Sequence, residues 1–273
     1  MKKLLVLLFT ILLIACSKEE VVIEKAIIPS GHTFSETALF LNYGEEEEAM
    51  LDEGFHCRSI SSYNYSSPIP YSGEVSTDYF QNTFFGGDSR VGSIALYTNL
   101  LDFGADVQYI TSLSLWRVYD MNVSEAVPYS LMELIQMTGR KNIYLLIGVN
   151  EMNGSDVSVW RDEYDAFVKE IQSAHPDANV ILMTCYTPQD LHNLPKETIR
   201  AYVDAQNGAI KEIALNNHAL YLDLNEALDV DGYVSEDFVW DGVHLNIDGA
   251  KVLEDYIRTH VYQEESYVKK VCE

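Results

Sequence analysis

Ser89 stands between a short apolar run and a helical pattern, in residues 84–90 with the sequence FFGGDSR. A serine at such a strand-to-helix turn exposes its hydroxyl at the sheet edge where open α/β folds bind ligands. The start of the following helix also favours negative charge that develops beside the serine. Gly87 and Asp88 are ordinary turn and capping residues, so the segment alone fits structural capping equally well. Ser89 is therefore a candidate nucleophile whose assignment depends on a base elsewhere in the chain.

Asp241 and His244 supply the groups that a serine nucleophile needs, three residues apart and just before the last helical pattern. A carboxylate at this spacing can orient the imidazole through one ring nitrogen, while the other nitrogen takes the serine proton. A single histidine before a helix is more often a capping or packing residue. The presence of Asp241 and of the Ser89 segment favours a Ser-His-Asp triad instead.

Asn150 follows another apolar run, in the sequence IGVNE at 147–151. The side-chain amide of an asparagine at a strand end can donate a hydrogen bond to an oxyanion, although asparagine is also a common turn residue. Metal catalysis has no comparable support, because the sequence contains neither a C-x-x-C nor an H-E-x-x-H motif and its histidines are scattered. We therefore expect chemistry that uses no metal and no cofactor.

Short apolar runs alternate with helical periodicity from residue 79 onward. This alternation is typical of β-α-β units, in which helices cover both faces of a parallel sheet. It predicts a three-layer α/β/α sandwich with a parallel sheet of about five strands, and it places the candidate residues at strand ends. The expected strands are 83–85, 107–110, 143–147, 180–184 and 219–222, and the expected helices are 90–101, 129–138, 161–174, 198–216 and 247–261.

Three short motifs resemble, in order, the first, third and fifth sequence blocks of the SGNH/GDSL hydrolase family, the GDSL-like lipases and acylhydrolases. The matching motifs are Gly87-Asp88-Ser89, Gly148-x-Asn150 and Asp241-x-x-His244. The resemblance covers residues 78–262 and implies a flavodoxin-like SGNH hydrolase fold. It also implies an esterase or acylhydrolase that works without a cofactor, with Ser89, Asp241 and His244 as the triad.

This chain departs from the family pattern in the second sequence block. The family has a glycine there whose N–H is an oxyanion donor, and this chain has Ser112, after the expected 107–110 strand. A serine N–H can still donate, but the side chain narrows the pocket. Glu151 replaces the aspartate often seen after the asparagine, which is a mild change with a structural explanation. The resemblance implies an oxyanion hole formed by Ser89, Ser112 and Asn150, supported by Gly87, Asp88 and Gly148.

The N-terminal residues are typical of a bacterial lipoprotein signal. Lys2 and Lys3 precede an apolar run at 4–15 that is short for a membrane span and stops at Cys16. The sequence LIAC at its end resembles the lipobox, in which the signal is cut before a cysteine that carries the lipid. We expect a mature protein that is anchored outside the cytoplasm through Cys16, although an ordinary cleaved signal or an uncleaved anchor fits the same run.

Four segments follow from these patterns: the signal at 1–15, a tether and lead-in at 16–77, the hydrolase domain at 78–262 and a tail at 263–273. A hydrophobic content of 47% is enough for one sizeable core, and no second periodic block requires another domain. The lead-in does not have the pattern of a core. We expect its acidic run at 45–48 to be solvated and its tyrosines to pack against the domain, with a carbohydrate-contacting surface as the alternative; these are Tyr63, Tyr65 and Tyr71.

Charge and cysteine content narrow the partners further. A formal net charge of −24 disfavours nucleic acid and anionic lipid headgroups, because the chain has too few cations to neutralise phosphates. Cys185 lies in an apolar run and is expected to be a buried free thiol, whereas Cys57 and Cys272 lie in flanking segments and can pair. The oligomeric state is left open.

Three functions remain compatible with these residues. The first is a serine esterase that acts on a small ester or an acylated carbohydrate, with removal of acetyl groups from polysaccharide favoured by the expected location. The second is an acyltransferase, in which a sugar hydroxyl rather than water resolves the acyl-enzyme. The third is a catalytically silent surface lipoprotein that binds glycan. The reason to consider it is that Ser112 stands where the family has a glycine.

Overall fold

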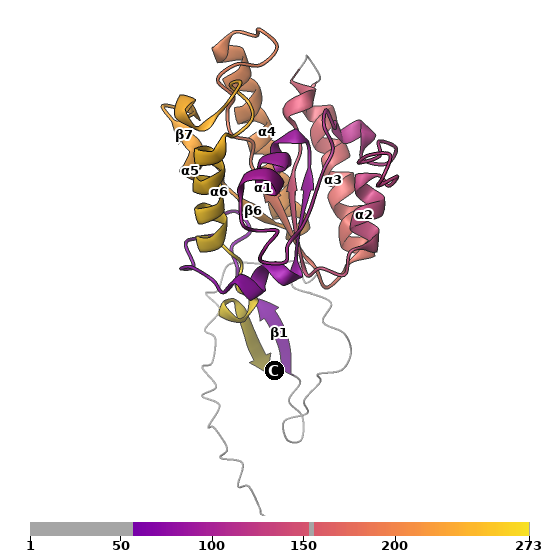
Figure 1. The fold of residues 1–273 in the computed structure, drawn as a ribbon. Coiled ribbons are helices and arrows are strands. Elements are labelled where there is room, and N and C mark those ends of the chain that lie inside the picture. The colour runs from indigo at the N-terminus through magenta and orange to yellow at the C-terminus, as the bar shows by residue number, and fades with distance from the viewer. Residues whose placement is uncertain (1–56, 153–155, 273) are drawn as a thin grey trace, which may run out of the picture. The chain divides into compact units, whose positions relative to one another are not determined.

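The computed structural model describes residues 57–152 and 156–272 (Figure 1). The predicted signal, the lipidation site Cys16 and the acidic run at 45–48 lie outside these residues, so what the sequence predicts for them stays a prediction. Among the helices that the structure describes, none combines the length and apolar character needed to cross a membrane.

Five parallel strands form the central sheet, in the order β3-β2-β4-β5-β6. The first strand of this sheet in chain order, β2, lies between β3 and β4, so the chain crosses the sheet in opposite directions on either side of it. This is the flavodoxin-like strand order, in which ligands bind at the carboxyl end of the strand where the direction changes. The strands are β2 (Thr83–Gly87), β3 (Asp106–Tyr109), β4 (Asn142–Leu146), β5 (Asn179–Met183) and β6 (Leu220–Leu222).

Successive residues of each strand contribute to different cores, as the two-residue period of a strand requires. Phe85, Tyr144 and Leu146 pack in one cluster with α1 and α6, whereas Phe84 and Ile143 pack in a second with α2, α3 and α4 (Figure 1). The sheet is therefore covered on both faces, and the predicted three-layer α/β/α sandwich is confirmed. The main helices are α1 (Gly92–Tyr97), α2 (Leu131–Met137), α3 (Val157–Ala174), α4 (Lys196–Asn217) and α6 (Ile247–Thr259).

The observed strands lie within two residues of the predicted bounds, but the first helix is much shorter than predicted. Instead of a helix over 90–101, the chain forms a 3-10 turn at Ser89–Val91 followed by α1, which ends at Tyr97. The cause is tertiary, because Glu254 of α6 accepts a hydrogen bond from the Asn99 N–H at 2.9 Å. That bond caps the chain where a longer helix would have continued.

A two-stranded antiparallel ribbon joins the segments predicted as lead-in and tail. It consists of β1 (Cys57–Ser61) and β9 (Val268–Cys272), and its register places Cys57 opposite Cys272. Opposite residues in such a ribbon have Cα atoms about 4.5–5.5 Å apart, within the range that a disulfide spans. The backbone is therefore compatible with the predicted pairing, which stays a prediction. Cys185 is a buried free thiol, as predicted.

Part of the predicted lead-in belongs to the core, although its sequence does not have the pattern of a core. Tyr63 and Ile69 are buried, and the Tyr63 ring lies edge-on to the rings of Tyr262 and Tyr267, at centroid distances of 5.4 and 4.9 Å. Tyr71, by contrast, is 71% exposed. The expected packing of the tyrosines against the domain therefore holds for Tyr63. The burial of Ile69 was not predicted, because the apolar residues of this segment have neither a helical nor a strand period. Smaller elements complete the fold: α5 (Asn225–Leu228), β7 (Asp229–Val230) and β8 (Tyr233–Val234).

Candidate active site

The strand-to-helix turn after β2 presents Ser89 at the carboxyl edge of the sheet. Asp88 caps the turn, because its Oδ1 accepts a hydrogen bond from the Arg90 N–H at 3.0 Å. Only glycine fits at position 87, since a Cβ there would collide with the Leu146 carbonyl of the neighbouring strand. The turn leaves Ser89 half-buried, with its Oγ 2.8 Å from Nε2 of His244.

A second turn, before α6, brings Asp241 and His244 to the same place. Nδ1 of His244 lies 2.8 Å from Oδ2 of Asp241, while Oδ1 of Asp241 accepts the His244 N–H at 2.8 Å and the Val243 N–H at 3.0 Å. Gly242, at φ +85°, provides the left-handed residue that this turn requires. Both partners of the predicted triad therefore meet Ser89 in a continuous chain of hydrogen bonds.

The ionisation of Asp241 fixes the tautomer of the imidazole. Partial burial raises the pKa of Asp241, but the hydrogen bonds from His244 and Val243 outweigh it, so the pKa lies below its ordinary value. A carboxylate at neutral pH accepts the Nδ1–H, which leaves Nε2 as the acceptor that faces the Ser89 hydroxyl. This is the tautomer that a general base for Ser89 needs.

Asn150 and Ser112 line the same cavity as His244. The side-chain Nδ2 of Asn150 donates one hydrogen bond to the Leu113 carbonyl at 2.7 Å, and its second N–H remains for a ligand. Ser112 has φ +60°, the left-handed conformation that favours glycine and costs another residue about 1–2 kcal/mol. The backbone thus explains why a glycine is expected at this position. Gly148, at φ +137°, ends β4 with its carbonyl held by Gln206 at 2.9 Å.

One cavity of about 290 Å³ is lined by the predicted triad and by the two other predicted oxyanion residues, Ser112 and Asn150. The structure adds six lining residues that were not selected from the sequence: Asp190, Leu191 and His192 from the loop after β5, and Thr111, Val149 and Val243, each next to a selected residue. A polar loop that follows a strand end was the available signal, because the carboxyl ends of parallel strands share one edge. Within the described residues no group of three or more histidines, cysteines or carboxylates is placed to hold a metal ion.

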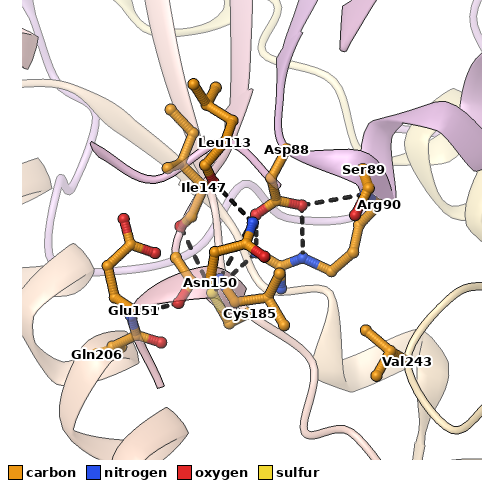
Figure 2. A network of polar contacts seen from close by, with 12 residues as sticks. Asp88, Ser89, Arg90, Leu113, Ile147, Asn150, Glu151, Cys185, Gln206 and Val243 are labelled. Atoms are coloured by element: carbon orange, nitrogen blue, oxygen red, sulfur yellow. Dashed lines mark hydrogen bonds and ion pairs between the residues drawn. The ribbon is translucent and has the colours of Figure 1, made fainter. Parts of the chain in front are cut away.

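A buried ion pair lies next to Ser89 (Figure 2). Nε and Nη2 of Arg90 donate to the two carboxylate oxygens of Asp88 at 3.0 and 2.8 Å, and both side chains are fully buried. Burial lowers the pKa of Arg90, but Asp88 more than compensates and the pKa lies well above its ordinary value. The sequence analysis gave Arg90 no role. The pair fixes Asp88, which in turn sets the direction of the turn that carries Ser89.

Glu151 is a second buried carboxyl in the same network, with a side chain that the sequence analysis regarded as structural. Burial raises its pKa to about 7, against the lowering effect of a hydrogen bond from the Leu115 N–H, and the nearby Asp88 raises it further. Because the folded state holds this proton more tightly than the unfolded state, the proton stabilises the fold below the unfolded pKa. That contribution is lost as pH rises through about 7.

The variant Glu151→Gln removes this titration and should change how stability depends on pH. We expect the free energy of unfolding of the parent to fall, relative to the variant, by up to about 3 kcal/mol between pH 4.5 and 8. Denaturant unfolding of both proteins across that range measures the difference. The matched control is Glu236→Gln, at a side chain that is 80% exposed. Parallel curves for Glu151→Gln and the parent would contradict the raised pKa.

Comparison with known proteins agrees with the fold and identifies the family. A GDSL-like lipase from Bacteroides thetaiotaomicron has 15% identity and a TM-score of 0.51, over 67% of this chain and 88% of that one. A candidate platelet activating factor from Streptococcus pneumonia has 19% identity and a TM-score of 0.52, over 66% and 84%. At these identities the likeness concerns the fold alone.

A search of curated proteins finds no match. The sequence profile of the GDSL-like Lipase/Acylhydrolase family matches residues 98–252, which include Ser112, Asn150, Asp241 and His244 and begin after Ser89. This match spans more than half of the chain's 273 residues. The protein therefore belongs to the GDSL-like lipase/acylhydrolase family.

Proposed function

We propose that this protein is a serine esterase that removes short acyl groups, such as acetyl groups, from carbohydrate outside the cytoplasm. The observation that carries the proposal is the relay of Ser89, His244 and Asp241, with 2.8 Å between Oγ and Nε2 and 2.8 Å between Nδ1 and Oδ2. The relay opens onto a cavity rather than into the core. This arrangement suits nucleophilic acyl transfer.

In the proposed reaction, Oγ of Ser89 attacks the ester carbonyl while Nε2 of His244 takes the hydroxyl proton. The Asp241 carboxylate stabilises the imidazolium that results. The alcohol leaves with the proton from His244, and water then attacks the acyl-enzyme in a second cycle of the same proton transfers. The N–H groups of Ser89 and Ser112 and the free N–H of Asn150 would hold the oxyanion in both steps.

The chemistry of the cavity wall favours a short acyl group and a polar alcohol. Among the described residues that line the wall, only Val149, Leu191 and Val243 contribute aliphatic side chains. A long acyl chain gains affinity by burying methylene groups, each worth about 0.8 kcal/mol, and this wall offers little surface for that. The polar lining suits the hydroxyl groups of a sugar instead; it consists of Ser89, Thr111, Ser112, Asn150, Asp190, His192, Asp241 and His244.

The proposed location rests on the N-terminal sequence. Two lysines, an apolar run at 4–15 and Cys16 support a lipid-anchored enzyme on the outer side of the membrane. An enzyme held there meets acylated polysaccharide in the envelope or the surroundings. Metabolic labelling with a fatty-acid analogue, compared between the parent and Cys16→Ala, tests this part of the proposal separately from catalysis.

A series of p-nitrophenyl esters tests the acyl-length preference. We expect kcat/KM to fall at least about tenfold from acetate to octanoate, a difference of 1.4 kcal/mol in transition-state stabilisation. Butyrate should lie between the two, and the Ser89→Ala variant corrects each rate for background hydrolysis. A higher kcat/KM for octanoate than for acetate would contradict the short-acyl proposal and indicate a lipase.

A further inference from the structure

The loop after β3 carries Ser112 in a conformation that needs support from elsewhere. A residue with φ +60° returns to the more favourable region unless its neighbours hold it. Leu113 and Leu115, on the far side of Ser112, are buried in the core. Their side chains fix the depth of the loop, but the direction of the Ser112 N–H depends on the backbone of the loop itself.

Two consecutive side chains from the end of β4 bind that backbone. Asn150 donates to the Leu113 carbonyl at 2.7 Å, and Oε1 of Glu151 accepts a hydrogen bond from the Leu115 N–H. One bond satisfies a carbonyl and the other an N–H, two residues apart. Together they restrain both translation and rotation of the loop segment. Figure 2 shows Asn150 and Glu151 on the same turn, beside Leu113 and the buried ion pair.

A glutamate is unusual at a buried position if its side chain serves only for packing. It is 1% exposed, and its second oxygen, Oε2, is buried with no hydrogen-bond partner in the part of the chain that the structure describes. An unpaired oxygen of this kind costs stability, which an apolar side chain of similar size would avoid. Compared with an apolar side chain, the carboxyl group adds one interaction, the hydrogen bond that it accepts from the Leu115 N–H.

We propose that Glu151 is a positioning residue that acts with Asn150 to hold the 111–115 loop, so that the Ser112 N–H faces the carbonyl oxygen of a bound ester. This inference rests on the proposed esterase function and deepens it. Without the carboxyl acceptor, the buried Leu115 N–H lacks a partner and the loop shifts to find one. The Ser112 N–H then moves away from the oxyanion, and the effect falls on kcat rather than on KM.

The test compares Glu151→Met, which removes the acceptor, with Glu151→Gln, whose amide oxygen keeps it. With p-nitrophenyl acetate we expect kcat of Glu151→Met to fall about 10–100-fold with KM nearly unchanged, and kcat of Glu151→Gln to stay within about threefold. Rates are expressed per active site, counted with a fluorophosphonate probe, so that loss of folded protein does not count as loss of turnover.

Glu254→Met is the matched control, because Glu254 is also buried and also accepts a backbone N–H, that of Asn99 beyond the far end of α1. It should lose stability but keep kcat per site. Should Glu151→Met give no folded protein, Glu151→Leu makes the same test, since its side chain also lacks the acceptor for the Leu115 N–H.

Two results would overturn the inference. One is a per-site kcat for Glu151→Met, or for Glu151→Leu in its place, equal to that of the parent. The other is a loss in Glu151→Gln as large as in Glu151→Met, because the acceptor would then not matter. Parent activity that depends on Ser89 is established first, so a failure of the esterase proposal is distinguishable from a failure of the positioning role.

Discussion

Ser89→Ala is expected to reduce hydrolysis of p-nitrophenyl acetate to the background rate, a loss of about 10⁴–10⁶ in kcat. The reason is that Oγ of Ser89 is the group held 2.8 Å from the proton acceptor Nε2 of His244. An alanine leaves the cavity and the oxyanion donors in place but removes the atom that forms the acyl-enzyme. The assay uses residues 17–273, with parent and variant measured side by side.

The matched control for this variant is Ser173→Ala, which removes an exposed serine hydroxyl that bonds the Lys169 carbonyl within α3. It should retain the parental rate. Circular dichroism of all three proteins shows whether the fold is intact. Equal rates in the parent and in Ser89→Ala, both above the uncatalysed rate, would exclude Ser89 as the nucleophile.

Asn150→Ala is expected to have the second-largest effect, a fall of about 10²–10³ in kcat with a much smaller change in KM. The amide has one N–H bonded to the Leu113 carbonyl and one left over, so it enters the site already oriented. A donor held in this way stabilises the charge that develops on the carbonyl oxygen and has little effect on the neutral ester. Steady-state kinetics with p-nitrophenyl acetate separates the two parameters.

Asn216→Ala, at an exposed position near the end of α4, is the control for the loss of an asparagine amide and should leave both parameters unchanged. If Asn150→Ala is as active as the parent, the side-chain amide has no part in holding the oxyanion. A rise in KM with unchanged kcat would instead assign Asn150 to ground-state binding of the ester.

The sheet was predictable from the sequence because its strands are buried on both faces and therefore are continuous apolar runs. Ile143, Tyr144 and Leu145 illustrate this, since none of them is exposed. The end of α1 was not predictable, because it depends on Glu254, which is far away in the sequence. The β1–β9 ribbon was missed for a similar reason: each strand is short, and its partner is at the other end of the chain.

The candidate site likewise contains residues that were predictable from the sequence and residues that were not. Ser89, Asn150, Asp241 and His244 were selected because their types and order resemble a family pattern, and the structure brings them to one sheet edge. The supporting residues Gly87, Asp88 and Gly148 belong to the same motifs, but Arg90 had no such signal. Arg90 stands two positions after Asp88 and pairs with it in the core, a contact that depends on burial rather than on spacing.

Covalent labelling of Ser89 tests the central claim most directly. Residues 17–273 are incubated with a fluorophosphonate probe, digested, and mapped by mass spectrometry, with Ser89→Ala treated in parallel. We predict a single adduct on the peptide that contains Ser89 and none in the variant, because the hydroxyl is activated by His244. Correctly folded protein that takes up no probe, or an adduct at another serine, would contradict the assignment of this site as a serine esterase centre.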